Sequence, residues 1–294
     1  MSSYQWGITI LHYKTVEITR KCIEILEKVF TGSIVIVDNG SNDGSGEKLR
    51  KEYSNVNHVH VILLEKNLGF SKGNNVGYMF LKRKGCDFII MLNNDAFIFQ
   101  KDFFNRIITE YEKNGFDIMG PMILDAEQNV VNSYPQKPIH MTVASTYMGQ
   151  AMCIIKWLLS FVGLDRKTEQ IILQKQKQQG NLQATQRYEN VLISGCCLIF
   201  AKGYIDKFDG LNQSTFLYLE EEILFARAKK CNLKIVYCPE IKVIHIGEAS
   251  TAKVLGNNKR KQRRFRYRNQ FFSFFVLKKE IISSNKNKFY RRFR

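Results

Sequence analysis

The chain has 294 residues, of which 45% are hydrophobic and 24% are charged, values typical of a globular protein. This length suffices for one large α/β domain with appendages, and only four prolines and 19 glycines exclude fibrous or low-complexity structure. The net charge of +17 is concentrated at one end, because residues 253–294 hold 15 of the 44 Lys and Arg residues but one acid, Glu280. We therefore expect a nearly neutral domain over residues 1–252 and a basic tail that seeks an anionic surface.

The segment from Met1 to Gly7 lacks the basic and apolar regions of a signal peptide. No uncharged apolar run approaches the roughly 20 residues needed to cross a bilayer. The best candidate, Ala151 to Leu164, is interrupted by Lys156. The seven cysteines include no C-x-x-C pair, so neither a disulfide framework nor a zinc site is indicated. We expect a reduced, cytoplasmic protein with buried thiols.

Strand and helix patterns alternate along the first part of the chain. Apolar, β-branched runs predict strands at residues 6–11, 33–37, 59–64 and 88–92. Helical periodicity lies between them, at residues 15–30, 44–53 and 73–84. The alternation predicts an α/β fold with a Rossmann-like, mostly parallel central sheet flanked by helices.

The second part of the chain is less regular. The pattern predicts a helix over 102–114, a strand over 117–124, a loop or short hairpin over 128–139, a strand over 191–200, a helix over 219–230 and strands over 234–237 and 242–246. Residues 140–190 form a variable insertion that lies over the core, apolar and helical over 141–164 and glutamine-rich over 167–187. A basic, aromatic helical tail follows over 253–294.

Three polar clusters follow predicted strands. They are Asp38-Asn39-Gly40-Ser41, the segment from Asn67 to Asn75, and Asn93-Asn94-Asp95. Each one alone is explained by the preference of Asn, Asp and Gly for turns. Ligands of open parallel sheets bind beyond the carboxyl ends of the strands, so three such clusters in order predict one binding crevice.

Acidic residues supply two candidate chemical groups. Asp95, at a strand end, suits a hard divalent cation that also binds a diphosphate, although a turn aspartate is the alternative. The run Glu220-Glu221-Glu222 lies at a predicted helix start, where carboxylates are favoured electrostatically. One of the three could also act as a general base toward a hydroxyl group. His245 ends a predicted strand, and a lone histidine there is more often structural.

These motifs resemble glycosyltransferase family 2, the inverting GT-A enzymes, and in particular its rhamnosyltransferase-like branch. The resemblance covers most of residues 4–275 and is weak over 126–190, and it implies that the insertion over 140–190 lies on the acceptor side. Six pieces follow one another in the family's order. They are residues 37–45, 67–77 and 92–95, then Ser194-Gly-Cys-Cys, then Phe216 to Glu222 with Arg227, and finally His245 with Ser250.

The resemblance implies a role for each matched residue. Asp38 would recognise the donor base, and Asn67, Gly69 and Asn75 would lie along the nucleotide and diphosphate. Asn93-Asn94-Asp95 takes the place of the Asp-x-Asp motif. Because its first position is Asn93, metal binding would rest mainly on Asp95.

The remaining matches concern the catalytic base and the end of the chain. Glu220-Glu221 aligns with the family's Glu-Asp pair, which makes Glu221 the expected base, with Glu220 as the alternative. His245 matches a histidine that completes the metal site in some relatives. Arg268, in an Arg-Asn pair of the predicted C-terminal helix, could face the donor phosphates.

The resemblance further implies Mg²⁺ or Mn²⁺ as cofactor and a nucleotide-diphosphate sugar donor, either dTDP-rhamnose or a UDP-hexose. A glycan or lipid-linked acceptor in bacterial surface polysaccharide synthesis would receive the sugar. The basic and aromatic residues of 259–277 suit an anionic membrane, which would place the protein at the inner face of the cell membrane, while a helix packed on the core is the alternative.

Three other functions remain open at this point. A sugar nucleotidyltransferase uses a similar fold but would carry a Gly-rich, basic loop after the first strand, where this chain has Leu11-His-Tyr-Lys-Thr15. A binding module of the same fold would bind donor without turnover. A nucleic-acid-binding protein would use the basic, aromatic tail, but the nearly neutral main domain offers no continuous basic track. We therefore expect no nucleic acid partner.

Overall fold

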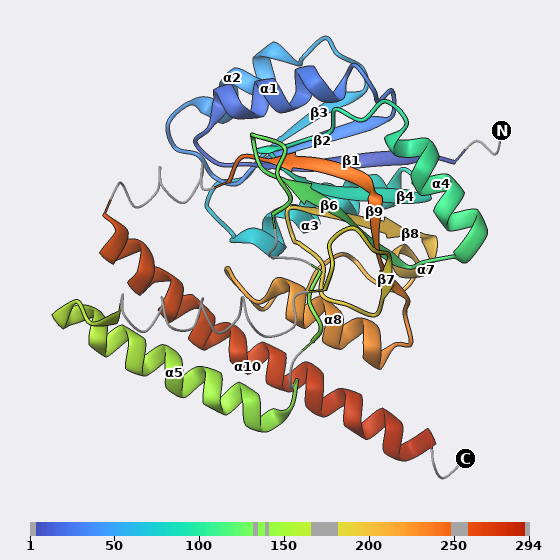
Figure 1. Cartoon of the computed structure of the whole chain (residues 1–294). Helices are drawn as coiled ribbons and strands as arrows, with labels where there is room; N and C mark the ends of the chain where they lie inside the picture. The colour runs from blue at the N-terminus through green and yellow to red at the C-terminus, as the bar shows by residue number, and fades with distance from the viewer. Residues whose placement is uncertain (1–3, 132–134, 139–140, 166–181, 248–257, 292–294) are drawn as a thin grey trace.

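The computed structural model describes residues 4–131, 135–138, 141–165, 182–247 and 258–291. One mixed sheet forms the centre, with strands in the order β3-β2-β1-β4-β8-β6-β9-β5 and with β7 paired to β9. Helices cover both faces of this sheet, and two long helices form a further layer beneath one of them (Figure 1). The predicted α/β class with a flanked central sheet is confirmed.

The first half of the sheet is parallel, as the sequence pattern predicted. Its strands are β1 (Trp6–His12), β2 (Ser33–Asp38), β3 (Val59–Leu63) and β4 (Phe88–Asn93). The helices that connect them are α1 (Val16–Leu26), α2 (Ser45–Glu52) and α3 (Phe70–Arg83). The carboxyl ends of these strands therefore lie along one edge, where the three polar clusters follow them.

The second half of the sheet departs from the sequence prediction. β8 (Cys197–Ala201) is antiparallel to both β4 and β6 (Ile118–Leu124), and it is shorter than the strand predicted over 191–200. The two strands predicted over 234–246 are one strand, β9 (Ile235–His245), whose register against β6 shifts after Pro121. The sequence pattern did not predict the two-residue strands β5 (Ala96–Phe97) and β7 (Tyr188–Glu189).

Two apolar clusters fill the space between the sheet and its helices. α1 and α4 (Phe103–Asn114) pack on one face through side chains such as Ile23 and Ile107. α3, α7 (Lys202–Ile205) and α8 (Glu220–Lys230) pack on the other through side chains such as Tyr78 and Leu224. Alternate strand residues contribute to each cluster, which is the pattern expected of a strand buried on both faces.

The additional layer consists of α5 (Val143–Val162) and α10 (Lys259–Arg291), which lie side by side, with α10 between α5 and α8 (Figure 1). Thr142 starts α5 with a capping box, because its hydroxyl accepts from Ser145 N and Ser145 Oγ accepts from Thr142 N. Gly163, with φ of 79°, ends it. The helix expected over 141–164 is thus present. Much of the glutamine-rich segment and the expected boundary at residue 253 fall outside the described residues.

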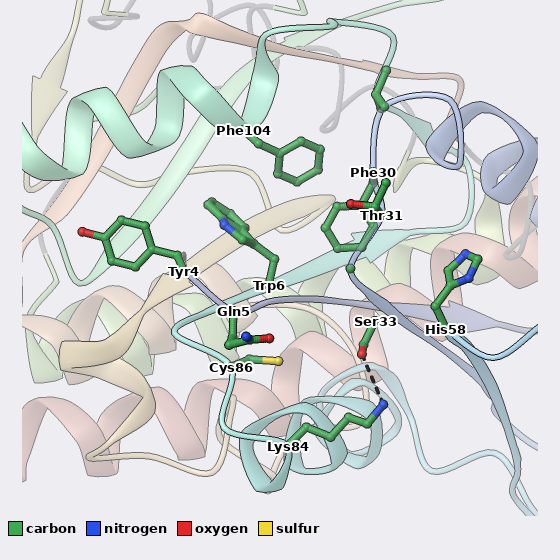
Figure 2. Close-up of a pocket in the computed structure, with 12 residues that line it drawn as sticks. Tyr4, Gln5, Trp6, Phe30, Thr31, Ser33, His58, Lys84, Cys86 and Phe104 are labelled. Carbon is green, nitrogen blue, oxygen red and sulfur yellow. Dashed lines mark hydrogen bonds between the residues drawn. The ribbon is translucent and has the colours of Figure 1, made fainter. Parts of the chain in front are cut away.

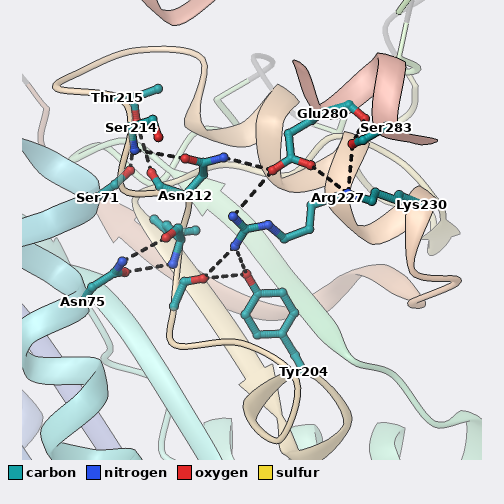
Figure 3. Close-up of polar contacts among 12 residues, drawn as sticks. Ser71, Asn75, Tyr204, Asn212, Ser214, Thr215, Arg227, Lys230, Glu280 and Ser283 are labelled. Atoms are coloured by element: carbon teal, nitrogen blue, oxygen red, sulfur yellow. Dashed lines mark hydrogen bonds and ion pairs between the residues drawn. The ribbon is translucent and has the colours of Figure 1, made fainter. Parts of the chain in front are cut away.

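The only acid of the basic tail attaches α10 to the rest of the protein. Asn212 donates a 2.9 Å hydrogen bond to Glu280, and Arg227 and Lys230 of α8 lie 3.6 and 3.8 Å from its carboxylate (Figure 3). Lys230 also donates to Ser283. From Lys259 to Ser283, the basic segment is therefore a helix packed on the α/β core, which is the alternative considered for this region.

Candidate functional site: loops and carboxylates at the carboxyl edge of the sheet

The loop after β2 and the loop after β3 hold each other in place. Asn39 donates from Nδ2 to Asn67 Oδ1 at 3.1 Å and to the Gly69 carbonyl at 3.2 Å, and its Oδ1 accepts from Leu68 N at 2.9 Å. Asn67 Oδ1 in turn accepts from Gly69 N at 2.8 Å. The expected donor-binding residues Asn67 and Gly69 thus lie on one preorganised loop.

Asp38 is the last residue of β2, immediately before the first of these two loops, and is 3% exposed. Its carboxylate accepts from Ser41 N, and Gly46 leaves it room because a Cβ at position 46 would collide with Asp38 Oδ2. Burial raises the pKa of Asp38, and the hydrogen bonds from Ser41 oppose that rise. The Asp38 carbonyl also accepts from Leu64 N at 2.9 Å, which places Asp38 close to the loop that carries Asn67.

Gly69 connects these loops to the segment that precedes the acidic run. Its φ of 84° is readily adopted by glycine, and a Cβ there would collide with the backbone of Phe216. Phe70 N donates to the Phe216 carbonyl at 2.8 Å. The sequence analysis gave Phe216 no role, although it begins the motif that contains the acids.

Two of the amide side chains predicted to bind the donor form hydrogen bonds within the protein. Asn75 exchanges two 2.8 Å hydrogen bonds with the backbone N–H and C=O of Leu211. Asn94 donates to Thr15 Oγ1 and Thr19 Oγ1 at 2.6 and 2.8 Å. Both side chains are buried, so these contacts hold the loops at the carboxyl edge of the sheet. Direct contact of Asn75 or Asn94 with a donor stays a prediction.

The end of β4 and the end of β9 bring the expected metal ligands together. His245 Nε2 lies 3.1 Å from Asp95 Oδ1, although 150 residues separate them in sequence. The pairing of Ala96 with His245 and the hydrogen bond from Ile246 N to the Asp95 carbonyl fix this approach. Asn93, the first position of the motif, is half-buried at the end of β4.

A carboxylate oxygen beside an imidazole nitrogen is a donor set that Mg²⁺ or Mn²⁺ can accept, with Mn²⁺ the more tolerant of nitrogen. Within the described part of the chain, no group of three or more His, Cys, Asp or Glu side chains could enclose a metal ion. Asp95 and His245 therefore fit a cation that takes its other ligands from a substrate diphosphate and water.

The three acids start α8 at an unusual backbone conformation. Tyr218 and Leu219 have φ values of 75° and 66°, which are uncommon for residues other than glycine. Such strain persists where the surrounding structure holds it in place, and it often occurs at functional sites. Here it turns the chain so that Glu220, Glu221 and Glu222 occupy the first turn of α8.

Burial changes the acidity of all three carboxylates. It raises the pKa of Glu220 to about 8 and that of Glu222 to about 7, and the charge of Glu221 contributes to both shifts. The pKa of Glu221 is also raised by burial, while the 3.1 Å hydrogen bond from Gly195 N opposes the rise. Glu220 Oε1 is buried without a hydrogen-bond partner among the described residues.

The segment that enters β8 joins the two acidic regions. A Cβ at Gly195 would lie 2.6 Å from Glu221 Oε1, so glycine permits the close approach of this carboxylate. The next residue, Cys196, accepts at its carbonyl from Asn93 N at 2.9 Å. Burial raises the pKa of Cys196 to about 12, and the charges of Asp95 and Glu221 add to the rise. Both carboxylates are thus close enough to influence one thiol, so the two acidic regions are neighbours at this segment.

Arg227 and Arg268, the two arginines of the matched motifs, take no part in the contacts at the carboxyl edge described above. Arg227 donates to the Gly210 carbonyl at 3.0 Å and pairs with Glu280 (Figure 3), so it connects α8 to α10. Arg268 is exposed on α10, next to the buried Tyr267. Contact between Arg268 and a donor phosphate stays a prediction.

Figure 2 shows a pocket between Trp6, Phe30, Ser33, His58 and Phe104. It adjoins the amino ends of β1 and β2, which is the edge opposite the polar clusters. Ligands of parallel sheets bind at the carboxyl edge, so this pocket does not belong to the candidate site.

Comparison with known proteins identifies the family. The model of glycosyl transferase family 2 matches residues 10–204, which is more than half of the chain. A low-salt glycan biosynthesis hexosyltransferase, Agl10 of Haloferax volcanii, is 26% identical over 240 residues. A dTDP-rhamnosyl transferase, RfbF of Shigella flexneri, is 27% identical over 120 residues. The aligned parts are 81% and 38% of this chain and 66% and 39% of these relatives.

Solved structures give the same fold. GalNAc-T7, in a crystal structure with UDP, GalNAc and Mn²⁺, superposes with a TM-score of 0.55 at 12% identity over 88% of this chain and 49% of that one. Residues 1–349 of S. aureus TarS, in complex with UDP, superpose with a TM-score of 0.53 at 13% identity over 90% and 69%. This chain therefore has the GT-A fold that the motifs implied, and it belongs to glycosyl transferase family 2.

Proposed function

We propose that the protein is an inverting glycosyltransferase that moves a sugar from a nucleotide-diphosphate donor to an acceptor hydroxyl group. The observation that carries the proposal is the pair of acidic regions next to residues 194–197, one with Asp95 beside His245 and the other with Glu221 bonded to Gly195 N. A cation site and a base near each other are what a displacement at a donor's anomeric carbon requires.

In this proposal the protein residues have separate roles. The loops that carry Asp38, Asn67 and Gly69 bind the nucleotide, with the Asn39 bridge keeping them in place. Asp95 and His245 hold Mg²⁺ or Mn²⁺, which when bound offsets negative charge on the diphosphate. The similar structure of GalNAc-T7 contains both UDP and Mn²⁺.

Glu221 removes the proton from the acceptor hydroxyl group. The oxygen then forms a bond to the anomeric carbon while the bond from that carbon to the diphosphate oxygen breaks, which inverts the configuration. The raised pKa of Glu221 makes this carboxylate a stronger base than an exposed one. Glu220 is the alternative base, and its pKa of about 8 makes it mostly protonated at neutral pH.

The relatives support the choice of donors. RfbF is named for dTDP-rhamnosyl transfer and Agl10 for hexosyl transfer in glycan synthesis, so dTDP-rhamnose and UDP-hexoses are the first donors to test. We propose a glycan or lipid-linked acceptor of a bacterial surface polysaccharide such as a capsule. We also propose a cytoplasmic location at the inner face of the cell membrane. No helix of the described chain is long and apolar enough to span a bilayer.

Calorimetry and turnover with UDP-, GDP- and dTDP-sugars, with and without Mn²⁺ or Mg²⁺, test the proposal. We expect metal-dependent binding of one donor and slow release of its nucleoside diphosphate. Release of pyrophosphate from a nucleoside triphosphate would instead identify a nucleotidyltransferase. Binding without turnover, with acceptors present, would identify a binding module.

A further inference from the structure

Helix α5 has its apolar side on the outside. The side chains that it buries against the protein are mainly polar, namely Thr146, Gln150, Cys153 and Ser160. Its most exposed large side chains are apolar, with Met148 73% and Val162 70% exposed. The outer face, defined here as Met148, Ile154, Ile155, Leu158, Phe161 and Val162, runs along the length of the helix.

This arrangement is the reverse of a helix on the surface of a protein in water, which buries its apolar side. The inner face of α5 also carries a cost, because Gln150 Nε2 is buried without a hydrogen-bond partner among the described residues. A contiguous exposed apolar surface of this kind marks a contact with another protein or with lipid. We therefore expect the outer face of α5 to contact an apolar surface of another protein or of lipid.

The charges around the outer face distinguish between a second protein molecule and lipid as the contact. Arg264 lies 3.7 Å from the ring centroid of Phe161 near one end of α5, and Lys278 lies 4.4 Å from that of Tyr147 near the other. α5 contains no acid and one base, Lys156. A second copy of α5 would bring cations against cations, whichever end it met. Anionic lipid headgroups would instead complement them.

The arginines of α10 also explain how α5 is held in this position. Arg260 donates to the carbonyls of Ser160 and Phe161, and Arg264 donates to Ser160 Oγ at 2.8 Å. These contacts satisfy carbonyls at the end of α5, where the helix dipole favours cations. Arg263 pairs with the buried Asp165. Part of the basic run is thus used to fix α5, and Lys259 and Lys261 remain exposed.

We propose that the outer face of α5 docks in the interfacial region of an anionic lipid bilayer, with the basic residues of α10 beside the headgroups. α5 has 20 residues but is not apolar enough to cross a bilayer, which fits a helix lying in the membrane plane. Tyr147 and Trp157, 57% and 40% exposed, are residue types enriched at membrane interfaces. This proposal assigns the membrane contact to α5 rather than to the basic tail alone.

Packed helices connect the outer face of α5 to the acidic run. Ile223 and Ala226 of α8 pack with Leu277 and Ile281 of α10, and Gly149 of α5 is in close contact with Phe274. Docking through α5 would therefore hold α8 and its glutamates at a fixed height above the lipid. The docking itself does not depend on the transferase proposal, whereas its use to position a lipid-linked acceptor does.

Flotation of the full chain with vesicles tests the docking. Vesicles of phosphatidylcholine alone are compared with vesicles that also contain phosphatidylglycerol, using wild type, Leu158→Gln and Met148→Gln. The control is Phe99→Gln, because Phe99 is 52% exposed, close to the 56% of Leu158, but lies after β5, away from α5. We expect binding to anionic vesicles, weakened about fivefold to tenfold by each α5 substitution and unchanged by the control.

Three outcomes would overturn the proposal. They are no binding to anionic vesicles, equal binding of wild type and the α5 variants, or a dimer in analytical ultracentrifugation that Leu158→Gln dissociates. Circular dichroism confirms that each variant is folded. Donor binding, measured by calorimetry on the same samples, is independent of docking, so failure of the transferase proposal is recognised separately.

Discussion

Two sets of polar side chains lie at the carboxyl edge of the sheet, and they differ in what they contact. The amides of Asn39, Asn75 and Asn94 are all occupied by hydrogen bonds to other loops. The carboxylate of Glu220 is buried and that of Glu221 is half-buried, both have few partners, and their pKa values are raised. The comparison teaches that the amides hold the loops in place, and it supports the proposal that the carboxylates carry the chemistry.

The largest effect should come from the expected base. Replacing Glu221 by Gln removes the proton acceptor but keeps the shape and the contact with Gly195 N. We expect nucleoside diphosphate release to fall by roughly 10²–10⁴-fold while donor affinity stays within about twofold. Steady-state kinetics and calorimetry measure the two quantities, and Glu222→Gln serves as the matched control on the same helical turn. Full turnover in Glu221→Gln would assign the role to another group.

The raised pKa of Glu220 predicts that stability depends on pH. Its pKa rises from the ordinary 4.5 to about 8, so between these values the folded protein binds more protons than the unfolded chain. The free energy of unfolding should therefore decrease as the pH rises from 5 to 8, by about 2–4 kcal/mol.

Glu220→Gln should flatten this dependence and make the protein more stable at pH 8. The exposed Glu24→Gln is the control and should leave the slope unchanged. Urea unfolding at the two pH values measures the effect. A stability that increases with pH, or a slope that Glu220→Gln does not alter, would contradict the expected burial of this acid.

Substitution of a buried amide should lower the free energy of unfolding rather than the turnover. Asn75→Ala leaves the N–H and C=O of Leu211 without their partners, which should cost about 2–3 kcal/mol of unfolding free energy. Asn55→Ala, at an exposed turn, should cost little. Thermal or urea unfolding compares the two. If Asn75→Ala were as stable as wild type but bound donor poorly, Asn75 would contact the donor directly, as the family motif implies.

The smallest effect concerns the attachment of α10. Glu280→Gln keeps a hydrogen bond to Asn212 possible but removes the charge that faces Arg227 and Lys230. We expect a loss of about 1–2 kcal/mol, because the carboxylate is only 13% exposed. Lys202→Gln, which breaks an exposed pair with Asp206, should change the melting temperature much less.

Much of the fold was predictable from local patterns. The β-branched run Ser33–Asp38 and the periodicity of Val143–Val162 identify a buried strand and a long helix before any tertiary contact is considered. Continuity of β9 across Pro239 was not predictable, because it depends on the register shift against β6. The two-residue strand β5 was missed because it is too short to show a pattern.

The candidate site was predictable in its residues but not in their contacts. The resemblance to the family implied that His245 could join Asp95, and β5 pairing with β9 brings them together. The sequence could not show that Asn75 bonds to Leu211 and that Asn94 donates to Thr15 and Thr19, since those partners carry no signal in it. Nor could it show that α5 faces outward with its apolar side, because periodicity identifies a helical face but not its surroundings.

One paired measurement tests the central distinction most directly. Glu221→Gln and Asn75→Ala are compared with wild type for the free energy of unfolding and, at a temperature where all three are folded, for nucleoside diphosphate release. The account predicts that Glu221→Gln keeps its stability and loses turnover, and that Asn75→Ala loses stability and keeps most of its turnover. The opposite pattern would contradict the assignment of chemistry to the carboxylates and of loop positioning to the amides.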